Sequence, residues 1–161
     1  MVLLAGGTGG AKLARGLLDE VGEQLVVIAN TGDDIEVHGG YVSPDPDLVL
    51  YWLADRIDDR GWGLRDDSFV VMEALRALGE DVWFNLGDRD LAVCIQRARR
   101  LGEGARLTET LAELSRALGD RVGEPEGDQV GVGAHVCPID LDVVAGVGDH
   151  HEVRALSLIH I

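Results

Sequence analysis

The stretch LAGGTGGAKLARGL, Leu4–Leu17, constrains the fold of this chain more than any other. Val2–Ala5 is a short apolar run that ends at glycines, and Ala11–Val21 then carries leucines at helical spacing. A strand, a glycine loop and a helix in this order predict the first unit of an α/β sheet. The N–H groups at the start of such a helix favour an anion, so the loop is a candidate phosphate site. Its candidate residues are Gly6, Gly7, Thr8, Gly9 and Gly10.

The spacing of this loop argues against two common nucleotide-binding motifs. Counted from Gly7, the third glycine of a dinucleotide fingerprint would fall on Lys12, which weakens that interpretation. A P-loop requires a serine or threonine directly after its lysine, where this chain has Leu13. The opening also resembles that of sugar nucleotidyltransferases, but these carry a Pro-Lys pair shortly afterwards, and Lys12 is the only lysine here. Two alternatives stay open: the glycines only permit a tight turn, and Lys12 either binds phosphate as a point charge or has no role.

The chain up to Gly119 alternates between strand and helix patterns. Leu25–Ala29 is apolar throughout, as a strand covered on both faces would be, and residues 30–46 predict a loop because they are rich in Gly, Asp and Pro. The further expected elements are a helix from Asp47, a helix over Ser68–Leu78, a strand over Asp81–Leu86, and helices over Leu91–Leu101 and Leu107–Leu118. This alternation predicts an α/β, doubly wound domain with a mainly parallel sheet.

The segment after Gly119 differs in character. Asp120–Ile161 is glycine-rich and has no helical stripe, and its stretch QVGVGAHV alternates weakly, as a small antiparallel appendage would. We therefore divide the chain into a domain over residues 1–119 and an unassigned tail over residues 120–161.

Composition narrows the range of partners. The 29 acidic and 14 basic residues give a formal charge of -15, which would repel a polyphosphate backbone, so nucleic acid is not an expected partner. Cys94 and Cys137 give neither a disulfide framework nor metal-ligand spacing, and no apolar stretch is long enough to span a membrane. We therefore expect a cytoplasmic protein with no membrane partner.

Two acidic loops follow the second expected strand. NTGDDIEVHGG, Asn30–Gly40, comes directly after it, and SPDPD, Ser43–Asp47, leads into a helix, so both loops belong at the carboxyl edge of the sheet, where such folds bind ligands. We expect four carboxylates to gather there and to need a cation, for which Mg²⁺ beside phosphate is suited. They are Asp33, Asp34, Asp45 and Asp47. The alternative is that they are only helix-capping and turn residues.

The motif GDRD, Gly87–Asp90, follows the third expected strand. Arg89 at that position is a candidate clamp for a carboxylate or phosphate, and the alternative is a surface arginine paired with Asp88 or Asp90. Trp62 in RGWG is a candidate stacking surface, although buried packing is the commoner fate of a tryptophan. The scattered histidines lack the spaced partners of a zinc site.

Six motifs in a fixed order resemble one known family. They are LAGGTGGAKLARGL, NTGDDIEVHG, SPDPDLVLYWLA, RGWGLRDDSF, WFNLGDRDLA and LTETLAEL, and they resemble the N-terminal half of 2-phospho-L-lactate transferase, from coenzyme F-420 biosynthesis. The resemblance implies a Rossmann-like fold and a Mg²⁺ cofactor. It also implies that a 2-phospholactyl or phosphoenolpyruvyl group moves from a guanosine diphosphate conjugate to the deazaflavin 7,8-didemethyl-8-hydroxy-5-deazariboflavin, with release of GMP.

The resemblance also suggests roles for individual residues. Asp33 and Asp45 would be metal ligands and catalytic residues, and Asp47 and Arg89 would lie on the deazaflavin side. The substrate-binding set would be Gly6, Gly7, Thr8, Gly9, Gly10, Lys12, Asn30, Asp47, Asp88 and Arg89. One departure is Pro46 in place of the family's leucine, a change that a helix start tolerates.

The second departure is length, because the family is about twice as long as this chain. The resemblance then implies a chain truncated relative to the family, and a frame-shifted or foreign sequence would explain the unassigned tail over residues 120–161. Missing residues would include part of the guanosine site and the contacts of a homodimer. Two alternatives to the enzyme remain: a non-catalytic nucleotide-sugar-binding regulator of the same superfamily, and an inactive fragment.

Overall fold

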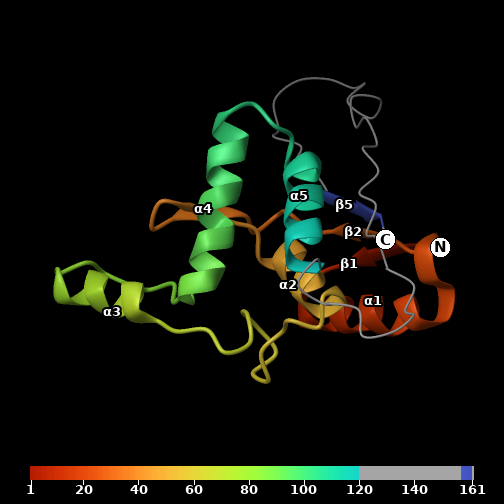
Figure 1. Ribbon diagram of the computed structural model, residues 1–161, viewed down its shortest axis with the longest axis horizontal. Helices are drawn as coiled ribbons and strands as arrows, with labels where there is room; N and C mark the ends of the chain where they lie inside the picture. The colour runs from red at the N-terminus through yellow and green to blue at the C-terminus, as the bar shows by residue number, and fades with distance from the viewer. Residues whose placement is uncertain (120–156, 161) are drawn as a thin grey trace.

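A computed structural model describes residues 1–119 and 157–160. Its elements, in chain order, are β1 (Val2–Ala5), α1 (Gly7–Val21), the 3-10 turn η1 (Gly22–Gln24), β2 (Val26–Ala29), β3 (Ile35–Val37), β4 (Gly40–Val42), α2 (Pro44–Leu53), α3 (Val70–Ala77), α4 (Asp88–Gly102), α5 (Leu107–Gly119) and β5 (Ser157–His160) (Figure 1). The fold is mixed α/β, as the sequence predicts.

The main sheet has the strand order β1-β2-β5. β1 and β2 are parallel, with Val2 opposite Val26 and Ala5 opposite Ala29, which is the predicted strand-loop-helix-strand unit. β5 pairs with the other edge of β2 in the antiparallel direction, so one of the two strand pairs departs from the mainly parallel sheet that we expected. β5 belongs to the tail, and the stretch expected to alternate, QVGVGAHV, lies outside the described residues.

One face of this sheet carries the main hydrophobic core. Ala5, Val27 and Ala29 are buried there against residues of α1, α2 and α5. On the opposite face, Val2 and Leu4 are 64% and 72% exposed. Within residues 1–119 and 157–160 the helices therefore cover one face only, and the doubly wound arrangement expected from the apolar second strand is not seen in this part of the chain.

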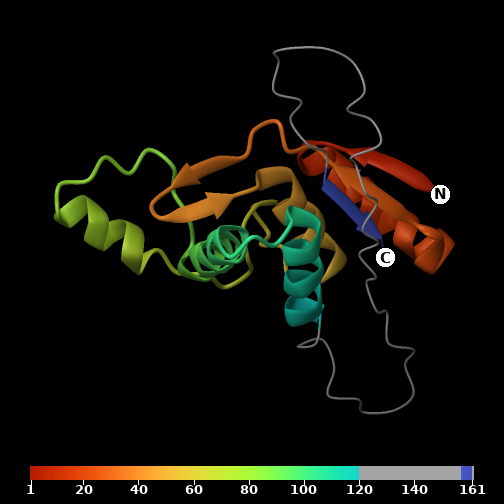
Figure 2. The same ribbon diagram turned by 90° about the horizontal axis from the view of Figure 1, so that it is seen from above.

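A second, smaller core lies at the end of the molecule away from the sheet. Both views place α3 and the β3–β4 hairpin there, beside α4 (Figures 1 and 2). Its buried members include Val42, Met72, Leu86, Leu91 and Cys94.

Two predictions in this region are wrong. Residues 30–46 are not all loop, because Ile35–Val37 and Gly40–Val42 form an antiparallel hairpin whose strands are too short to give a clear alternation. Asp81–Leu86 is not a strand. It has no neighbouring strand to bond, and Val82 and Phe84 instead pack into the second core.

The predicted helices are all present, with earlier starts for α1, α2 and α4. α1 begins at Gly7 and not at Ala11, so Gly7–Gly10 of the predicted glycine loop form its first turn, and we keep the name glycine loop for Gly6–Gly10. α2 begins at Pro44, because a proline suits the first helical turn. The starts of α3 and α4 lie next to each other, and each is capped by a carboxylate from the other's side. Asp67, just before α3, caps α4, and Asp88, in the first turn of α4, caps α3. Asp67 accepts hydrogen bonds from the N–H groups of Arg89 and Asp90, and Asp88 accepts them from those of Val70 and Val71. None of the helices in the described part of the chain is both long and apolar enough to cross a membrane.

Candidate active site

Asp45 is the centre of the contacts at the glycine loop. Its Oδ1 accepts a hydrogen bond of 2.6 Å from the N–H of Gly7, and its Oδ2 accepts one of 3.1 Å from Nδ2 of Asn30. The same Nδ2 donates to Oδ1 of Asp33 at 3.0 Å. The predicted pair Asp33 and Asp45 is thus brought together beside the start of α1, with Asn30 between the two carboxylates.

The glycine loop presents an open helix start to solvent. Gly6, Gly7 and Gly9 are exposed, and a Cβ placed on Gly9 would meet nothing within 4 Å. Gly10 has a different reason to be glycine, because a Cβ there would lie 2.9 Å from the Cα of Ala5 on β1. The first turn of α1 carries no acidic residue of its own, and the carboxylate of Asp45 already accepts the N–H of Gly7 there, as the positive end of a helix favours.

The other two carboxylates do not join this pair, which corrects the expectation that all four gather. Oδ1 and Oδ2 of Asp34 accept hydrogen bonds from the hydroxyls of Ser43 and Tyr41, and burial raises the pKa of Asp34. Asp47 forms an ion pair with the fully buried Arg97. The cause for Asp47 is helical geometry: it lies two residues after Asp45, about 200° around α2, so the two side chains leave opposite sides of the helix.

The alternative in which Asp45 and Asp47 merely cap their own helix is not supported either. No side chain caps the start of α2 at Ser43. Both carboxylates are used in contacts with other elements: the glycine loop for Asp45, and α4 for Asp47.

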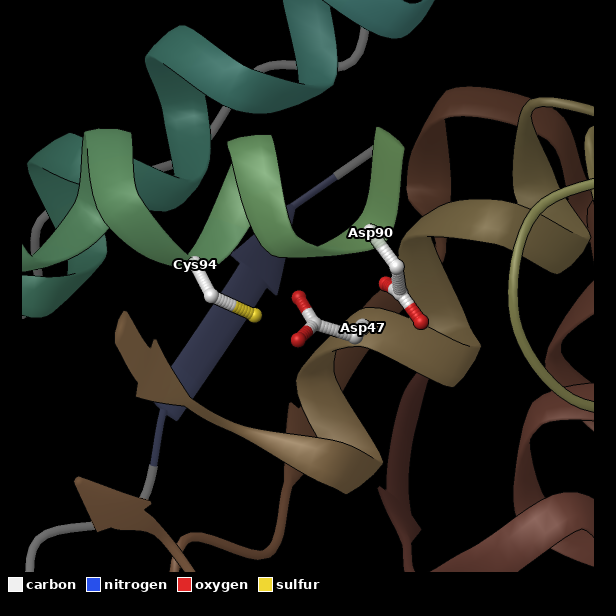
Figure 3. Close-up of side chains that lie close together, drawn as sticks. All are labelled: Asp47, Asp90 and Cys94. Atoms are coloured by element: carbon white, nitrogen blue, oxygen red, sulfur yellow. The ribbon is translucent and has the colours of Figure 1, made fainter. Parts of the chain in front are cut away.

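A second acidic group lies between α2 and α4. Figure 3 shows Asp47 from α2 and Asp90 and Cys94 from α4 pointing into the same space. Their ligand atoms lie within 4.8 Å of one another. Arg97 donates to both oxygens of Asp47 and, at 2.8 Å, to the carbonyl of Tyr41. Burial lowers the pKa of Arg97, but the carboxylate of Asp47 outweighs it and the pKa is raised overall.

Asp90 is held in a different way. The hydroxyl of Tyr51 donates a hydrogen bond to its Oδ1. Burial, and to a smaller extent the nearby charges of Asp47 and Asp67, raise the pKa of Asp90 to about 6. Sequence reasoning assigned Asp90 no role beyond a partner of Arg89, because a second aspartate in a helix start looks like an ordinary first-turn acid.

The two acidic groups differ in their suitability for Mg²⁺. Asp33 and Asp45 offer hard carboxylate oxygens beside a helix start that favours phosphate, which is the donor set that Mg²⁺ takes. In the group of Asp47, Asp90 and Cys94, Arg97 already neutralises one carboxylate, and burial raises the pKa of the Cys94 thiol. A protonated thiol is no ligand for Mg²⁺, so the residues at the glycine loop fit this ion and the buried group does not.

A cavity of about 230 Å³ opens beside the buried group. Asp47, Tyr51, Asn85 and Asp90 contribute its polar side chains. Its apolar walls include Val42, Leu48, Trp62, Phe84 and Leu86. Trp62 is 42% exposed, so it is not a buried packing residue, and the guanidinium carbon of Arg60 lies 4.3 Å from its ring centroid.

This cavity is connected to the glycine loop by direct neighbours. Gly61, next to Trp62, lies so close to the loop that a Cβ on it would be 3.8 Å from Cγ2 of Thr8. The first turn of α2 forms the other connection, because Asp45 contacts the loop while Pro44 and Asp47 line the cavity. The cavity and the glycine loop are therefore neighbours at this side of the molecule.

Three predicted site residues lie in other settings. Lys12 is exposed on α1, with Nζ 5.5 Å from the centroid of the Trp52 ring. Asp88 accepts hydrogen bonds from Ser68 and the start of α3, which lower its pKa. Arg89 is exposed and pairs with neither Asp88 nor Asp90. None of the three lines the cavity or contacts the pair of Asp33 and Asp45 in the described part of the chain.

The fold and this edge together define a class: mixed α/β proteins in which a glycine loop between a strand and a helix lies beside two carboxylates. Within that class, the chain belongs to the 2-phospho-L-lactate transferase CofD family, whose model matches residues 1–125. The resemblance of the six motifs is thereby confirmed.

Individual relatives agree with this assignment. The chain is 41% identical over 121 residues to a 2-phospho-L-lactate transferase of Methanosarcina mazei, a match covering 74% of this chain and 40% of the relative. It is 45% identical over 132 residues to a phosphoenolpyruvate transferase of Thermobifida fusca, covering 75% of this chain and 40% of the relative. It is 36% identical over 146 residues to a 2-phospho-L-lactate transferase of Methanococcoides burtonii, a match covering 89% of this chain and 44% of the relative. The chain thus spans less than half the length of these curated relatives.

Proposed function

We propose that this chain carries the donor and acceptor sites of a Mg²⁺-dependent transferase that moves a 2-phospholactyl or phosphoenolpyruvyl group onto a deazaflavin and releases GMP. Family membership supports the reaction class. The names of the relatives support both donors, since some are 2-phospho-L-lactate transferases and others phosphoenolpyruvate transferases. The donor in this proposal is the guanosine diphosphate conjugate of either acid.

The observation that carries the proposal is the meeting of Asp33, Asp45 and Asn30 at the start of α1. The N–H groups of the first turn of α1 bind the donor's diphosphate, and the positive end of the helix favours its charge. The carboxylates of Asp33 and Asp45 hold Mg²⁺, which neutralises charge on the transferring phosphoryl group and on the leaving GMP. Asn30 keeps the two carboxylates in register.

The acceptor occupies the neighbouring cavity, where Trp62 and Phe84 provide apolar ring surfaces. At about 230 Å³ the cavity is smaller than the roughly 300–1,000 Å³ of complete small-molecule sites, so it takes the ring system and leaves the hydroxyl-bearing chain to extend toward the glycine loop. The hydroxyl oxygen attacks phosphorus, the bond from phosphorus to the GMP oxygen breaks, and a carboxylate at the loop takes the hydroxyl proton.

Titration calorimetry with GDP, with and without Mg²⁺, tests the donor site. Gly9→Val puts a branched side chain into the open space at the helix start and should abolish GDP binding. Gly16→Val is the matched control, because Gly16 is also exposed on α1 and a Cβ there also meets nothing within 4 Å. GDP binding that is equal in both variants and the original chain, or absent from all three, contradicts the proposal.

A further inference from the structure

One oxygen in the cavity beside α2 has no partner although its carboxylate is almost fully buried. Asp90 is 8% exposed, and its Oδ1 accepts the hydrogen bond of Tyr51. Within the described residues, Oδ2 accepts none. It faces the RGWG loop, where a Cβ on Gly63 would lie 3.6 Å from it. Because Asp90 lines the cavity, this oxygen can be reached from the cavity, and an occupant that displaces water there must supply a donor in its place.

Asp47 and Tyr51, which line the cavity beside Asp90, do not offer the same opportunity. Both oxygens of Asp47 are engaged by Arg97, and the hydroxyl of Tyr51 already donates to Asp90. The remaining wall is largely apolar. Asp90 is therefore the carboxylate at this place that has hydrogen-bonding capacity left for an occupant of the cavity.

We propose that Asp90 selects the acceptor: its Oδ2 accepts a hydrogen bond from an N–H or O–H group on the acceptor's ring system, and Tyr51 is the positioning residue that fixes the carboxylate. This inference rests on the proposed function, since it assumes that the acceptor's ring occupies the cavity. It gives the site a means of rejecting flat aromatic molecules without a donor at that edge, because such a molecule would displace water from Oδ2 and leave this oxygen unpaired.

The residues around Asp90 hold its carboxylate in one position, so its hydrogen bond to a ligand would have a fixed geometry. The backbone N–H of Asp90 donates to Asp67 at 3.0 Å, which holds the start of α4 in place. Tyr51 is itself 1% exposed on α2. The oxygen is thus held by two helices and a loop, the preorganisation that a discriminating contact needs.

The test measures the affinity of the full chain for 7,8-didemethyl-8-hydroxy-5-deazariboflavin and, in parallel, for GDP. Asp90→Asn should weaken deazaflavin binding about tenfold or more, since a hydrogen bond to a charged group is lost, and leave GDP binding unchanged. Tyr51→Phe should weaken deazaflavin binding by a smaller factor while keeping the shape of the cavity. Asp81→Asn, which removes the same charge from an exposed position, is the control and should change neither affinity.

Analogues methylated at the ring N–H or at the ring hydroxyl identify the donor. The analogue whose methyl group removes the donor to Asp90 should bind the original chain and Asp90→Asn with equal affinity. The second analogue should still bind the original chain about tenfold more tightly than Asp90→Asn. If Asp90→Asn does not fold, Tyr51→Phe with the same analogues gives the answer. Unchanged deazaflavin affinity in the variants overturns the inference and leaves the proposed function standing. Failure of the original chain to bind the deazaflavin overturns both, and equal losses for GDP and deazaflavin show a structural role only.

Discussion

Asp45 and Asp47 stand two residues apart in one motif, yet they belong to two different chemical settings. Asp45 is 7% exposed and accepts hydrogen bonds from the amide groups of Gly7 and Asn30, and in the described part of the chain no arginine or lysine pairs with it or with Asp33. Asp47 lies in the interior and is paired with a fully buried arginine. The comparison teaches that a helix separates the neighbours of an acidic motif by angle, so charge density along the sequence is a poor guide to charge density in space.

The two settings also differ in how their charge is balanced. In the interior, Arg97 compensates Asp47, and removing either partner would leave a charge without water or counter-ion. At the glycine loop, the N–H donors of Gly7 and Asn30 balance the buried Asp45, and Asp33 is exposed to solvent, so neither carboxylate is neutralised by an arginine or lysine of the described residues and both are available to a cation.

The largest effect should come from breaking the interior pair. Arg97→Leu leaves Asp47 buried and unpaired, and we expect the free energy of unfolding to fall by about 3–5 kcal/mol. Urea unfolding followed by circular dichroism measures this change. The control is Arg99→Leu, because Arg99 lies on the same helix and its ion pair with Glu103 is exposed, so its effect should stay within about 0.5 kcal/mol. Similar decreases in the free energy of unfolding of both variants would mean that the buried pair of Asp47 and Arg97 stabilises the fold no more than an exposed ion pair does.

The next effect concerns the pH dependence of stability through Asp90. Its folded pKa of about 6 lies above the ordinary 3.8, so the protonated carboxyl favours the folded state and this stabilisation is lost as the pH rises from about 4 through about 6. Asp90→Asn removes the titration. The variant should therefore gain about 2 kcal/mol relative to the original chain between pH 4 and pH 7.5, measured by unfolding at each pH. The charged or titratable groups that face Asp90 are Asp47, Tyr51, Asp67, Cys94 and Arg97, all unchanged in the comparison.

Asp88 provides the control of opposite sign. Hydrogen bonds from Ser68 and the start of α3 lower the pKa of Asp88, so its ionised form favours the folded state. Asp88→Asn should lose stability relative to the original chain as the pH rises through the lowered pKa to the ordinary 3.8, with no further change at higher pH. If both variants shift in the same direction, the burial of Asp90 is not the cause of its effect.

The smallest effect on folding is expected at the glycine loop. Asp33 is exposed, so Asp33→Asn should change the free energy of unfolding by no more than about 0.5 kcal/mol. The same variant should lose the enhancement of GDP binding by Mg²⁺, because one carboxylate ligand is gone. Calorimetry with and without Mg²⁺ provides the second measurement. An enhancement equal to that of the original chain would remove Asp33 from the metal site.

Much of the fold could be predicted because its signals are local. The glycine loop between Val2–Ala5 and α1 and the leucine spacing of α5 each lie within a few turns of chain. The hairpin could not be predicted, since three-residue strands give no period, and neither could the absence of a strand at Asp81–Leu86, since a strand depends on a partner elsewhere in the chain.

The site was predictable to the same extent. Residues adjacent in motifs gave Asn30, Asp33 and Asp45 correctly as neighbours. Pairings across long separations were missed: Asp47 meets Arg97 fifty residues later, and Tyr51 meets Asp90 thirty-nine residues later. Nothing in the composition around Arg97 distinguishes it from the other arginines of its helix, because burial is a property of the packed structure.

The junction at Gly87 shows what a sequence signature can record. A Cβ on Gly87 would lie 2.1 Å from Oδ2 of Asp67, so this glycine is needed where Asp67 caps α4 while Asp88 caps α3. The motif GDRD therefore supplies the contact by which α3 and α4 cap each other, as well as one cavity residue, Asp90. A sequence search with this motif would also find proteins that share the capped pair of helices but bind another substrate. A match to GDRD therefore indicates this helix arrangement as much as it indicates a particular chemistry.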